Sequence, residues 1–479
     1  MTDRLSFPFD KHRTVRNIFH RLLDAGASDV LLVGGSVRDF LLGRVSTDFD
    51  IEVYGLDFEK IEAALAGNCR TERVGKSFGV LKVGRNIDIA LPRTEIKAGV
   101  GHTGFEVHSD PNLDPKTAFG RRDFTINAMG LRLDGTLIDF YGGARDLEKK
   151  ILRAPTAAFK EDPLRVLRAM QFASRFEMTL DQRTAEYCRE VAGEFSTLSK
   201  ERLYEEWKKW ALKGRFPSMG LDILKQTGWA DLFPQIGALI GCQQNPQWHP
   251  EGDVWTHTCL VTNEMAKHIG AGRHDTRWGE PYDDQTRIVL MFAALCHDLG
   301  KPVVTRRDET GTIRSLGHAE AGVPLAASFL ESIKAPGAVI DRVLPLVHEH
   351  MAILNTQKFG GVTPRTLRRL ANRLWPATVR LWCALCQSDA LGCFPPARDD
   401  KTIRFQADVW LDAAEREAVR DAKPKPILQG RDLLGRGIKP GPAMGRLLSE
   451  AYEAQLNNEI NTLEQANRWL EERLEKGCP

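Results

Sequence analysis

The chain has 479 residues, of which 42% are hydrophobic and 27% charged, and its formal net charge is +2. This length predicts about two to four domains, and the near-neutral charge excludes a globally basic nucleic-acid-binding protein. No apolar run reaches the roughly 18 residues of a membrane-spanning helix. With scattered cysteines and no apolar signal core at the start, we expect a soluble cytoplasmic protein with reduced thiols and no membrane partner.

The first 148 residues predict a mixed α/β region. A helix over about 10–26 leads to an apolar strand over 29–33, and the Gly34-Gly35 turn then precedes a second helix over 37–43. A second strand follows over 49–54. Runs bounded by turn residues predict further strands at 80–83, 87–91, 131–133 and 137–140.

Two acids, Asp48 and Asp50, stand in the segment STDFDIEVY at the mouth of the second strand. Side chains two residues apart on a strand share a face, so the carboxylates project together and repel unless a cation lies between them. Magnesium binds through one or two carboxylates plus substrate phosphates, which suits a phosphoryl-transfer site. The alternative is an aspartate that caps a turn beside an unrelated surface acid.

The Gly34-Gly35 turn supports the first interpretation. Two glycines allow backbone amides to approach a triphosphate closely, and the start of the following helix adds partial positive charge. Arg38 then either serves the phosphates or braces the turn. A second turn, Gly75-Lys76-Ser77, faces phosphate in the same way or simply opens a hairpin.

From about residue 150 onward, apolar residues recur with helical spacing and predict a mostly helical second part. Its segments include EDPLRVLRAMQFASRF, KERLYEEWKKWALK, HTCLVTNEMAKHI and TRIVLMFAALCHDLG. In the first of them, Asp162, Arg165 and Arg168 recur every three residues and predict an acid–base ladder along one helix face. A solvated, salt-bridged face is the alternative.

Histidines and acids on separate predicted helices suit a metal site in this part of the chain. Imidazole with carboxylate suits a divalent transition metal that activates water, whereas a lone helical histidine is usually a core or surface residue. The adjacent pair His297-Asp298, with separated partners, favours the metal. The candidate ligands are His257, His297, Asp298 and Asp389, with His318 and His350 for a second metal.

Six segments in chain order carry a resemblance to a known family. They are GGSVRDFLLGR, STDFDIEVYG, GKSFGVLKV, GRRDFTINAMG, LIDFYGGARDLEKKILR and EDPLRVLRAMQFASRF. As an ordered set over about residues 28–215, they resemble the class II tRNA nucleotidyltransferases of the polymerase-β-like superfamily, and bacterial poly(A) polymerases share them. The later H…HD…D pattern resembles the HD phosphohydrolase superfamily.

The resemblance implies a multidomain α+β fold. A polymerase-β-like nucleotidyltransferase head with a mixed sheet over 1–148 would be followed by all-α regions. These are a helical neck and body over 149–240, a helical HD domain over 241–400 and a C-terminal helical tail over 401–479 that is a candidate for RNA binding.

The resemblance also implies roles for the head residues. Asp48 and Asp50 would hold the catalytic Mg²⁺. Asp88 occupies the position where the superfamily often places a third acid, but class II enzymes generally use two. Nucleotide contacts are expected from Gly35, Arg38, Arg122 and Asp123.

Base selection is expected from Asp162 and Arg165, which would face the Watson–Crick edge of the incoming nucleotide, and Arg168 is a further expected nucleotide-binding residue. A carboxylate accepts from the exocyclic amine that cytosine and adenine share, and an arginine donates to a ring nitrogen or carbonyl oxygen. The implied substrates are CTP and ATP, with tRNA as the partner. The polar stretch 93–121 resembles the flexible loop of this family, whose presence favours addition of the terminal A.

At the HD site, the resemblance implies a divalent transition metal such as Ni²⁺ or Mn²⁺. The implied activities are 2′,3′-cyclic phosphodiesterase and phosphatase. Phosphates of tRNA require basic contacts, for which the chain offers three patches. They are Lys200, Arg202, Lys208 and Lys209; Arg365, Arg368, Arg369 and Arg373; and Arg431, Arg436, Lys439 and Arg446.

The expected function is therefore template-independent addition and repair of the 3′-terminal CCA of tRNA, with an HD phosphohydrolase activity. The alternatives are a poly(A) polymerase, a CC- or A-only tRNA nucleotidyltransferase, an HD phosphohydrolase with an RNA-binding head, and a non-catalytic RNA scaffold. Poly(A) polymerases typically lack an HD module and carry a strongly basic tail, which favours CCA addition here. The sequence predicts no oligomeric state.

Overall fold

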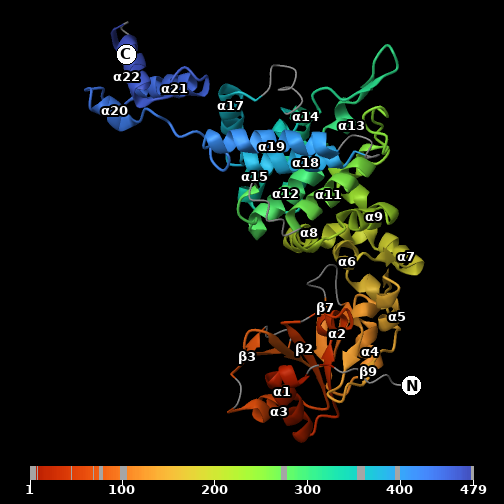
Figure 1. Ribbon diagram of the computed structural model, residues 1–479. Helices are drawn as coiled ribbons and strands as arrows, with labels where there is room; N and C mark the ends of the chain where they lie inside the picture. Colours follow the sequence, from red (N-terminus) through yellow and green to blue (C-terminus); the bar gives the residue numbers. More distant parts are fainter. Residues whose placement is uncertain are drawn as a thin grey trace. The chain divides into compact units, whose positions relative to one another are not determined.

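The structure is a computed structural model, and it describes residues 7, 9–44, 46–67, 70–74, 79–97, 105–270, 278–352, 362–393 and 400–475. The chain forms two compact units, Met1–Leu232 and Phe233–Pro479 (Figure 1). The predicted turn residues Gly75, Lys76 and Ser77 lie outside the described residues. None of the helices in the described ranges has both the length and the apolar character that crossing a membrane requires.

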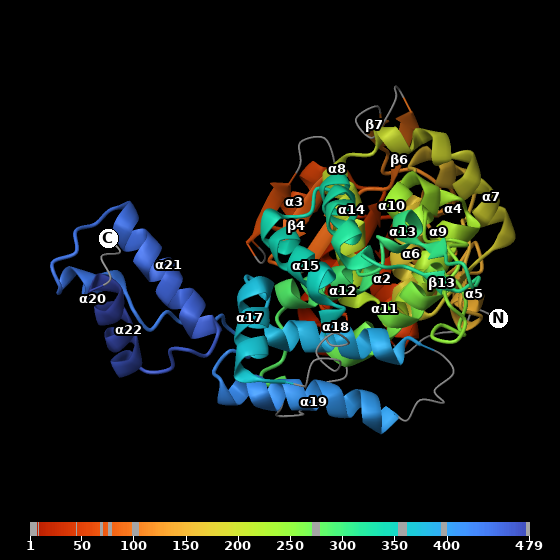
Figure 2. The same cartoon turned by 90° about the horizontal axis from the view of Figure 1, so that it is seen from above.

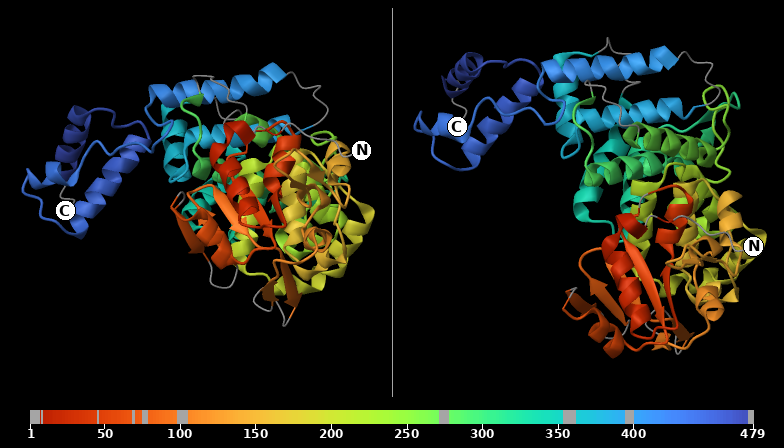
Figure 3. Two further views of the ribbon diagram at one scale, coloured as in Figure 1. Left: turned by 90° about the horizontal axis from the view of Figure 1, so that it is seen from below. Right: turned by 60° about the horizontal axis from the view of Figure 1, so that its bottom comes forward.

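A seven-stranded mixed sheet with the order β3-β4-β5-β2-β1-β8-β9 forms the centre of the first unit (Figure 3, red to orange). The central strand β2 pairs antiparallel with β1 and parallel with β5. The mixed sheet confirms the predicted head. The strands are β1 (Asp29–Val33), β2 (Phe49–Tyr54), β3 (Thr71–Val74), β4 (Val80–Val83), β5 (Ile87–Ala90), β8 (Gly130–Leu131) and β9 (Leu137–Ile138).

The strands agree closely with the prediction in the centre of the sheet and less well at its edge. The predicted bounds of β1, β2 and β4 match the structure. The predicted strands 131–133 and 137–140 are shorter in the structure, because a turn begins where Gly135 N donates to the Arg132 carbonyl oxygen at 3.0 Å.

Helices α1 (Arg13–Asp24), α2 (Gly35–Leu41) and α3 (Phe58–Leu65) complete this layer. The predicted helix 10–26 begins only at Arg13, and the short 3₁₀ turn η1 (Phe9–Lys11) precedes it. Phe9 of this turn packs on Phe19 with ring centroids 5.4 Å apart. Helix α1 then buries side chains at helical spacing, and each contributes roughly 1.5–3 kcal/mol to folding. These side chains are Val15, Ile18, Phe19 and Leu22.

The polar stretch 93–121 carries structure of its own. Strands β6 (Arg93–Lys97) and β7 (Phe105–Ser109) form an antiparallel hairpin, and α4 (Pro115–Gly120) follows. Asp114 caps this helix by accepting a hydrogen bond from Thr117 N at 3.1 Å. The expected flexible loop therefore contains ordered elements on both sides of residues 98–104, which lie outside the described residues.

The rest of the first unit is helical, as predicted from residue 150 onward. Buried Trp207, Trp210 and Trp229 form much of its core, and the indole N–H groups of Trp210 and Trp229 donate to backbone carbonyls at 3.1 and 2.8 Å. The helices and short elements are η2 (Thr125–Asn127), α5 (Gly143–Glu148), β10 (Ile151–Leu152), η3 (Ala157–Glu161), α6 (Arg165–Phe176), β11 (Thr179–Leu180), α7 (Gln182–Glu190), η4 (Ala192–Thr197), α8 (Lys200–Lys213), α9 (Pro217–Gln226) and η5 (Trp229–Leu232).

The second unit is a bundle of helices around α12 (Asp284–Cys296). Its segment IVLMFAALC is buried on every side, which is the pattern of a central core helix. Helices α18 and α19 lie side by side in this bundle (Figures 1 and 2). The other bundle elements are α10 (Pro234–Gly237), α11 (Val254–Gly270), α13 (Lys301–Val304), β12 (Arg306–Arg307), β13 (Ile313–Arg314), α14 (His318–Ser332), α15 (Gly337–Glu349), α17 (Pro364–Leu374), α18 (Val379–Leu391) and α19 (Asp400–Arg416).

The C-terminal helices gather around a small core of their own (Figure 2, blue). They are α20 (Gly430–Leu434), α21 (Pro442–Leu456) and α22 (Leu463–Glu475). Leu433 and Leu470 are fully buried in this core. These helices agree with the expected helical C-terminal region, and the bounds 401–479 stay a prediction.

We expect Gly220→Ala to destabilise the first unit. A Cβ at Gly220 of α9 would lie 2.2 Å from Ser174 Oγ and 2.4 Å from the Met170 carbonyl oxygen, both in α6. Overpacking of this kind costs about 1–3 kcal/mol, so the midpoint of thermal unfolding measured by circular dichroism should fall. Gly193→Ala is the matched control, because its Cβ would meet nothing within 4 Å. Equal midpoints for the two variants would contradict the close packing of α6 on α9.

Candidate functional site

The predicted acid pair lies where β2 begins. Asp48 immediately precedes the strand and Asp50 is its second residue, and both are exposed while Phe49 between them is buried. The Asp48 carbonyl oxygen accepts from Ser36 Oγ at 2.9 Å, which ties it to the first turn of α2. Sequence reasoning missed Ser36, although it belongs to the quoted segment GGSVRDF.

Carboxylates accumulate around Asp50. Asp50 lies opposite Asp88 on the neighbouring strand β5, and Glu52 follows it on the same face of β2. Although the side chain is open to solvent, partial desolvation raises the pKa of Asp50, and the carboxylates of Asp88, Asp48 and Glu52 raise it further, against the lowering effect of Arg122. A divalent cation would relieve this repulsion, so the carboxylates present fit a magnesium site that is completed by substrate phosphates.

The glycine turn passes close to this pair. Gly34 has a φ of +69°, and a Cβ there would lie 3.0 Å from Arg122 Nη1 and 3.6 Å from Asp50 Oδ2. Gly35 is the first residue of α2. The turn therefore requires glycine for both its backbone conformation and its packing, and it places the helix N-terminus beside the acids.

Arg122 is held next to Asp50 by a residue that the sequence analysis did not select. Buried Glu52 pairs with Arg122 Nη2 at 3.0 Å and also accepts a hydrogen bond from the Tyr54 hydroxyl. Burial, followed by the Glu52 carboxylate, raises the pKa of Tyr54 well above its usual range, so the hydroxyl stays a donor. The alternation Asp-x-Glu in FDIEVY is the signal that could have identified Glu52.

Arg38 braces the turn in this structure, which was one of its two predicted roles. Its side chain is buried and donates to Asp39 Oδ1 at 2.9 and 3.0 Å and to Asn127 Oδ1 at 2.5 Å. The guanidinium carbon lies 5.3 and 4.8 Å from the ring centroids of Phe172 and Phe176. Arg38 thus links α2 to α6, and its contact with a triphosphate stays a prediction.

Asp123 and Arg168 form a buried ion pair. Asp123 Oδ2 lies 2.6 Å from Arg168 Nη2, and Asn127 Nδ2 donates to Asp123 Oδ1 at 2.9 Å. Burial raises the pKa of Asp123, but the Arg168 guanidinium and these hydrogen bonds lower it by more than burial raises it. The pKa is therefore below its usual value and the carboxylate stays ionised. The pair joins the segment RRDFTIN to α6 and places the two predicted nucleotide-binding residues together.

The expected ladder of Asp162, Arg165 and Arg168 on one helix face is not how these charges are arranged. Helix α6 begins only at Arg165, so Asp162 lies ahead of it and pairs with Arg202 of α8 at 2.7 Å. Arg165 is buried and donates to the carbonyl oxygens of Ala158 and Arg121 at 2.7 and 2.8 Å. The three side chains therefore reach three different elements, and their role in base selection stays a prediction.

The six predicted ligands in the second unit come together in one buried centre. His257 projects from α11, the pair His297-Asp298 directly follows α12, and His318 begins α14. His350 directly follows α15, and Asp389 belongs to the last turn of α18. Five of the six are buried and Asp389 is half-buried.

Asp298 divides this centre into two groups of three ligands. One group is His257, His297 and Asp298, and the other is Asp298, His318 and His350. Oδ2 of Asp298 lies 3.3 Å from His297 Nε2, while Oδ1 lies 3.4 Å from His318 Nε2. A single carboxylate thus faces both groups, as a ligand that bridges two metal ions would.

The environment of Asp298 supports metal binding. Lys301 Nζ lies 2.7 Å from Oδ2 as an ion pair, yet among the described residues neither carboxylate oxygen receives a hydrogen bond. Burial raises the pKa of Asp298, but Lys301 and His297 lower it well below its usual range. Lys301 supplies one cation to Oδ2, and a metal ion would supply further positive charge to this buried, ionised carboxylate.

The four imidazoles are oriented alike. Nδ1 of three of them faces the carbonyl oxygen three residues earlier in the chain, at 2.9 Å for His297, 2.7 Å for His318 and 2.6 Å for His350. Nδ1 of His257 faces Glu251 Oε1 at 2.9 Å. Donation from Nδ1 leaves the Nε2 lone pair toward the centre, which is the arrangement of histidine ligands in metal sites. Nitrogen with carboxylate oxygen suits a transition metal.

The basic patches have different environments. Arg368, Arg369 and Arg373 are used inside the second unit, where they pair with Glu417 at 2.8 Å, Glu453 at 3.1 Å and Glu349 at 2.8 Å. These three arginines therefore tie helices together, while Arg365 of the same patch is exposed, and RNA binding by the patch stays a prediction. Lys208 and Lys209 pair with acids one turn earlier in α8. The last patch is exposed at Arg431, Arg436, Lys439 and Arg446.

Each of the two units contains a segment that matches a known domain family. Residues 30–153 match the poly A polymerase head domain, and residues 254–380 match the HD domain. The multifunctional CCA protein of Vibrio campbellii is 34% identical over 383 residues, which cover 76% of this chain and 85% of that protein. The multifunctional CCA protein of Vibrio parahaemolyticus is 36% identical over 374 residues, with the same coverage.

Solved structures share the fold. The Bacillus stearothermophilus CCA-adding enzyme in complex with CTP has a TM-score of 0.60 at 22% identity and covers 97% of this chain and 99% of that one. The Thermotoga maritima CCA-adding enzyme complexed with tRNA has a TM-score of 0.57 at 19% identity and covers 98% and 97%. Both matched domains imply the use of divalent metal. With more than a third of the aligned residues identical over most of a relative's length, this chain belongs to the family of the bacterial multifunctional CCA proteins, the class II CCA-adding enzymes that its motifs predicted.

Proposed function

We propose that this protein completes and repairs the 3′-terminal CCA of tRNA, adding cytidine and adenosine from CTP and ATP without a nucleic-acid template. The observation that carries this proposal is the exposed pair Asp48 and Asp50 beside the Gly34 turn, with Arg122 held against it. The head 1–148 and the neck and body 149–240 would carry this reaction, and 241–400 and 401–479 would form the HD domain and the RNA-binding tail.

Asp48 and Asp50 would hold Mg²⁺. The bound metal would neutralise the phosphates and lower the pKa of the attacking 3′ hydroxyl. The N-terminal amides of α2, at Gly35, would face the triphosphate, and Arg122 would pair with it while Glu52 keeps its guanidinium in place. Attack of the 3′ oxygen on the α-phosphorus forms one phosphate ester and releases pyrophosphate.

Asp162 would accept a hydrogen bond from the exocyclic amine of the incoming base. A carboxylate has about four acceptor sites, so Asp162 can keep its ion pair with Arg202 while it accepts from the base. Arg165 and Arg168 are positioned by backbone carbonyls and by Asp123, and Arg165 would supply the donor to the base. Cytosine and adenine present this amine at the same position of the Watson–Crick edge, where uracil and guanine present a carbonyl oxygen.

The HD centre would hydrolyse 2′,3′-cyclic phosphates and phosphomonoesters. Its imidazole and carboxylate ligands suit Ni²⁺ or Mn²⁺, which would supply the activated water. Lys301, 2.7 Å from Asp298, adds positive charge beside a substrate phosphate. Such an activity would prepare damaged RNA 3′ ends for nucleotide addition.

Asp48→Ala should reduce CTP incorporation by at least about a thousandfold, because several kcal/mol of charge stabilisation are lost with the metal. The assay uses tRNA ending at the discriminator, at C and at CC, with each nucleotide supplied separately, and so separates CCA, CC-only, A-only and poly(A) addition. Asp88→Asn is the informative comparison, since two acids suffice in the proposal and its effect should be small. Unchanged incorporation by Asp48→Ala would refute the metal assignment.

Asp162→Ala should lower the preference for CTP and ATP over UTP and GTP by roughly 10- to 100-fold, the value of one well-placed pair of hydrogen bonds to a base. Competition assays with mixed nucleotides measure this ratio. Arg202→Ala is the matched control, because it breaks the same ion pair and leaves the carboxylate. If both variants lose selectivity equally, Asp162 acts by holding Arg202 and not by contacting the base.

His297→Ala should abolish hydrolysis of a 2′,3′-cyclic nucleotide while sparing CTP incorporation, and the bound transition metal measured by elemental analysis should fall with it. His348→Ala is the control, since this histidine is half-exposed and pairs with Glu349. Loss of both activities with an unchanged circular dichroism spectrum would argue against two independent centres.

A further inference from the structure

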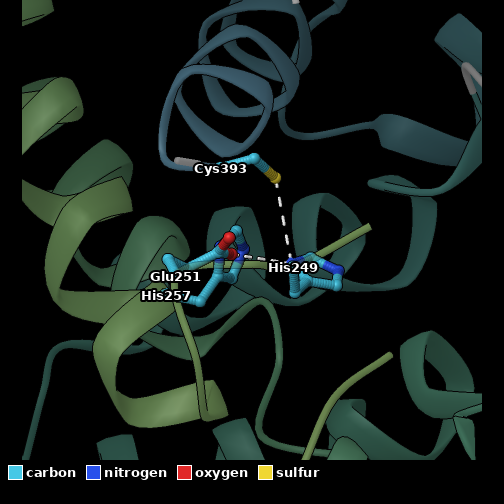
Figure 4. Close-up of side chains that lie close together, drawn as sticks. All are labelled: His249, Glu251, His257 and Cys393. Carbon is cyan, nitrogen blue, oxygen red and sulfur yellow. Dashed lines mark hydrogen bonds and ion pairs between the residues drawn. The ribbon is translucent and has the colours of Figure 1, made fainter. Parts of the chain in front are cut away.

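A cluster of nitrogen, oxygen and sulfur ligand atoms lies next to the HD centre. Of its members, His249, Glu251 and Cys393 take no part in the reactions proposed above. Figure 4 shows His249, Glu251, His257 and Cys393 turned toward one another, with Cys393 reaching in from beyond the end of α18. We infer that His249, Glu251 and Cys393 form a separate binding site for a thiophilic divalent metal such as Zn²⁺, with a fourth position beside His257 Nδ1.

The donor atoms lie close to the spacing of such a site. His249 Nδ1 is 2.8 Å from Glu251 Oε1, and Cys393 Sγ is 3.8 Å from His249 Nδ1. The four potential ligand atoms, including Nδ1 of His257, lie within 4.8 Å of one another. Tetrahedral zinc with bonds of about 2.0–2.3 Å separates its ligand atoms by roughly 3.3–3.7 Å. Small side-chain adjustments would therefore seat a metal ion.

The chemistry of the donors differs from that of the HD centre. The HD centre offers nitrogen and oxygen, whereas this cluster adds a sulfur atom, and thiolate selects zinc and other soft ions over magnesium and calcium. A thiol beside an imidazole also loses its proton readily, which a thiolate ligand requires. Among the described cysteines, Cys393 is the one that belongs to such a donor cluster.

Local chain geometry explains why the cluster forms. His249 and Glu251 stand two residues apart in the segment HPEGD that leads into α11, the helix that carries His257. Cys393 lies four residues after Asp389 and its Sγ contacts the Asp389 carbonyl oxygen at 3.8 Å. The segments that precede α11 and follow α18, two of the helices that carry HD candidate ligands, thus supply the second set, on the opposite edge of the His257 ring.

The cluster has a route for a metal ion. His249 lines a cavity of 520 Å³ between the segment 243–253 and the hairpin around Arg307 and Thr310. Its side chain is 21% exposed, whereas that of Glu251 is 2% exposed. An ion would enter through the cavity, meet His249 first and then reach the buried carboxylate.

A simpler role for Glu251 is to orient His257. Its Oε1 lies 2.9 Å from His257 Nδ1, and such a contact alone would fix the ring for the HD centre. That role requires neither Cys393 nor His249. Direct observation of a bond between metal and sulfur therefore decides between a metal site and a role of Glu251 that is limited to orienting His257.

The test is a Co²⁺ titration of the metal-free full-length protein, followed by absorption spectroscopy. We expect a thiolate-to-cobalt charge-transfer band in the wild type that is lost in Cys393→Ser and in Glu251→Gln, with one Co²⁺ fewer bound per chain at equilibrium dialysis. Cys242→Ser is the matched control, because Cys242 is also half-buried in this unit, and it should keep the band. His350→Ala, which changes the HD centre only, should keep it as well.

Absence of the band in the wild type, or its persistence in Cys393→Ser, would overturn the inference. A variant that loses the band must also keep the wild-type circular dichroism spectrum and its CTP incorporation. His249→Gln provides a second variant that leaves the thiol in place, and an unchanged band there would equally overturn the site.

Discussion

The buried carboxylate of Asp298 is the constraint on which the second unit depends. An ionised carboxylate removed from water costs several kcal/mol, and the single ion pair with Lys301 offsets only part of this. Four imidazoles surround it. Burial lowers the pKa of His257, but hydrogen bonds to Asp389 and Glu251 raise it well above its usual value, whereas burial lowers the pKa of His318 and lowers that of His350 to about 4, so the last two rings add no compensating charge. A bound metal would therefore contribute to the folding free energy here, and the buried segment IVLMFAALC of α12 supplies stability that tolerates the site without it.

The head solves a related problem in the opposite way. Its carboxylates also repel one another, but Asp48 and Asp50 remain exposed at the start of the central strand β2, where water lowers the cost of their charge. An open edge suits a metal that arrives with its substrate and leaves with the product. The enclosed imidazole centre suits a resident metal, since entry and exit require passage between packed helices. Exposure thus separates the two kinds of metal use within one chain.

The sequence predicted what local patterns determine. Periodicity and spacing predicted the central strands and placed Asp48 and Asp50 at the start of one of them. The resemblance to the HD pattern selected the six candidate ligands that the structure brings together. Arg38 and Asp162 show the limit, because their partners Asn127 and Arg202 lie 89 and 40 residues away in the chain. Glu52 was missed because it lies inside an apolar strand, where the hydrophobic pattern predicts a strand and gives no sign of a functional acid. The ion pairs of the α17 arginines could not be predicted, because their acidic partners lie in α15, directly after α19 and in α21, which no local pattern reveals.

The arginines near the expected nucleotide site share one property, which is that each already has a fixed partner. Arg122 pairs with Glu52, Arg168 with Asp123, and Arg202 with Asp162. A side chain held in this way has lost its rotamer freedom before any ligand arrives, so little further entropy is lost on binding. The same partners keep the local charge near neutral in the absence of nucleotide. A triphosphate would then meet donors that are oriented in advance, and fixed dipoles and charges stabilise developing charge at low reorganisation cost.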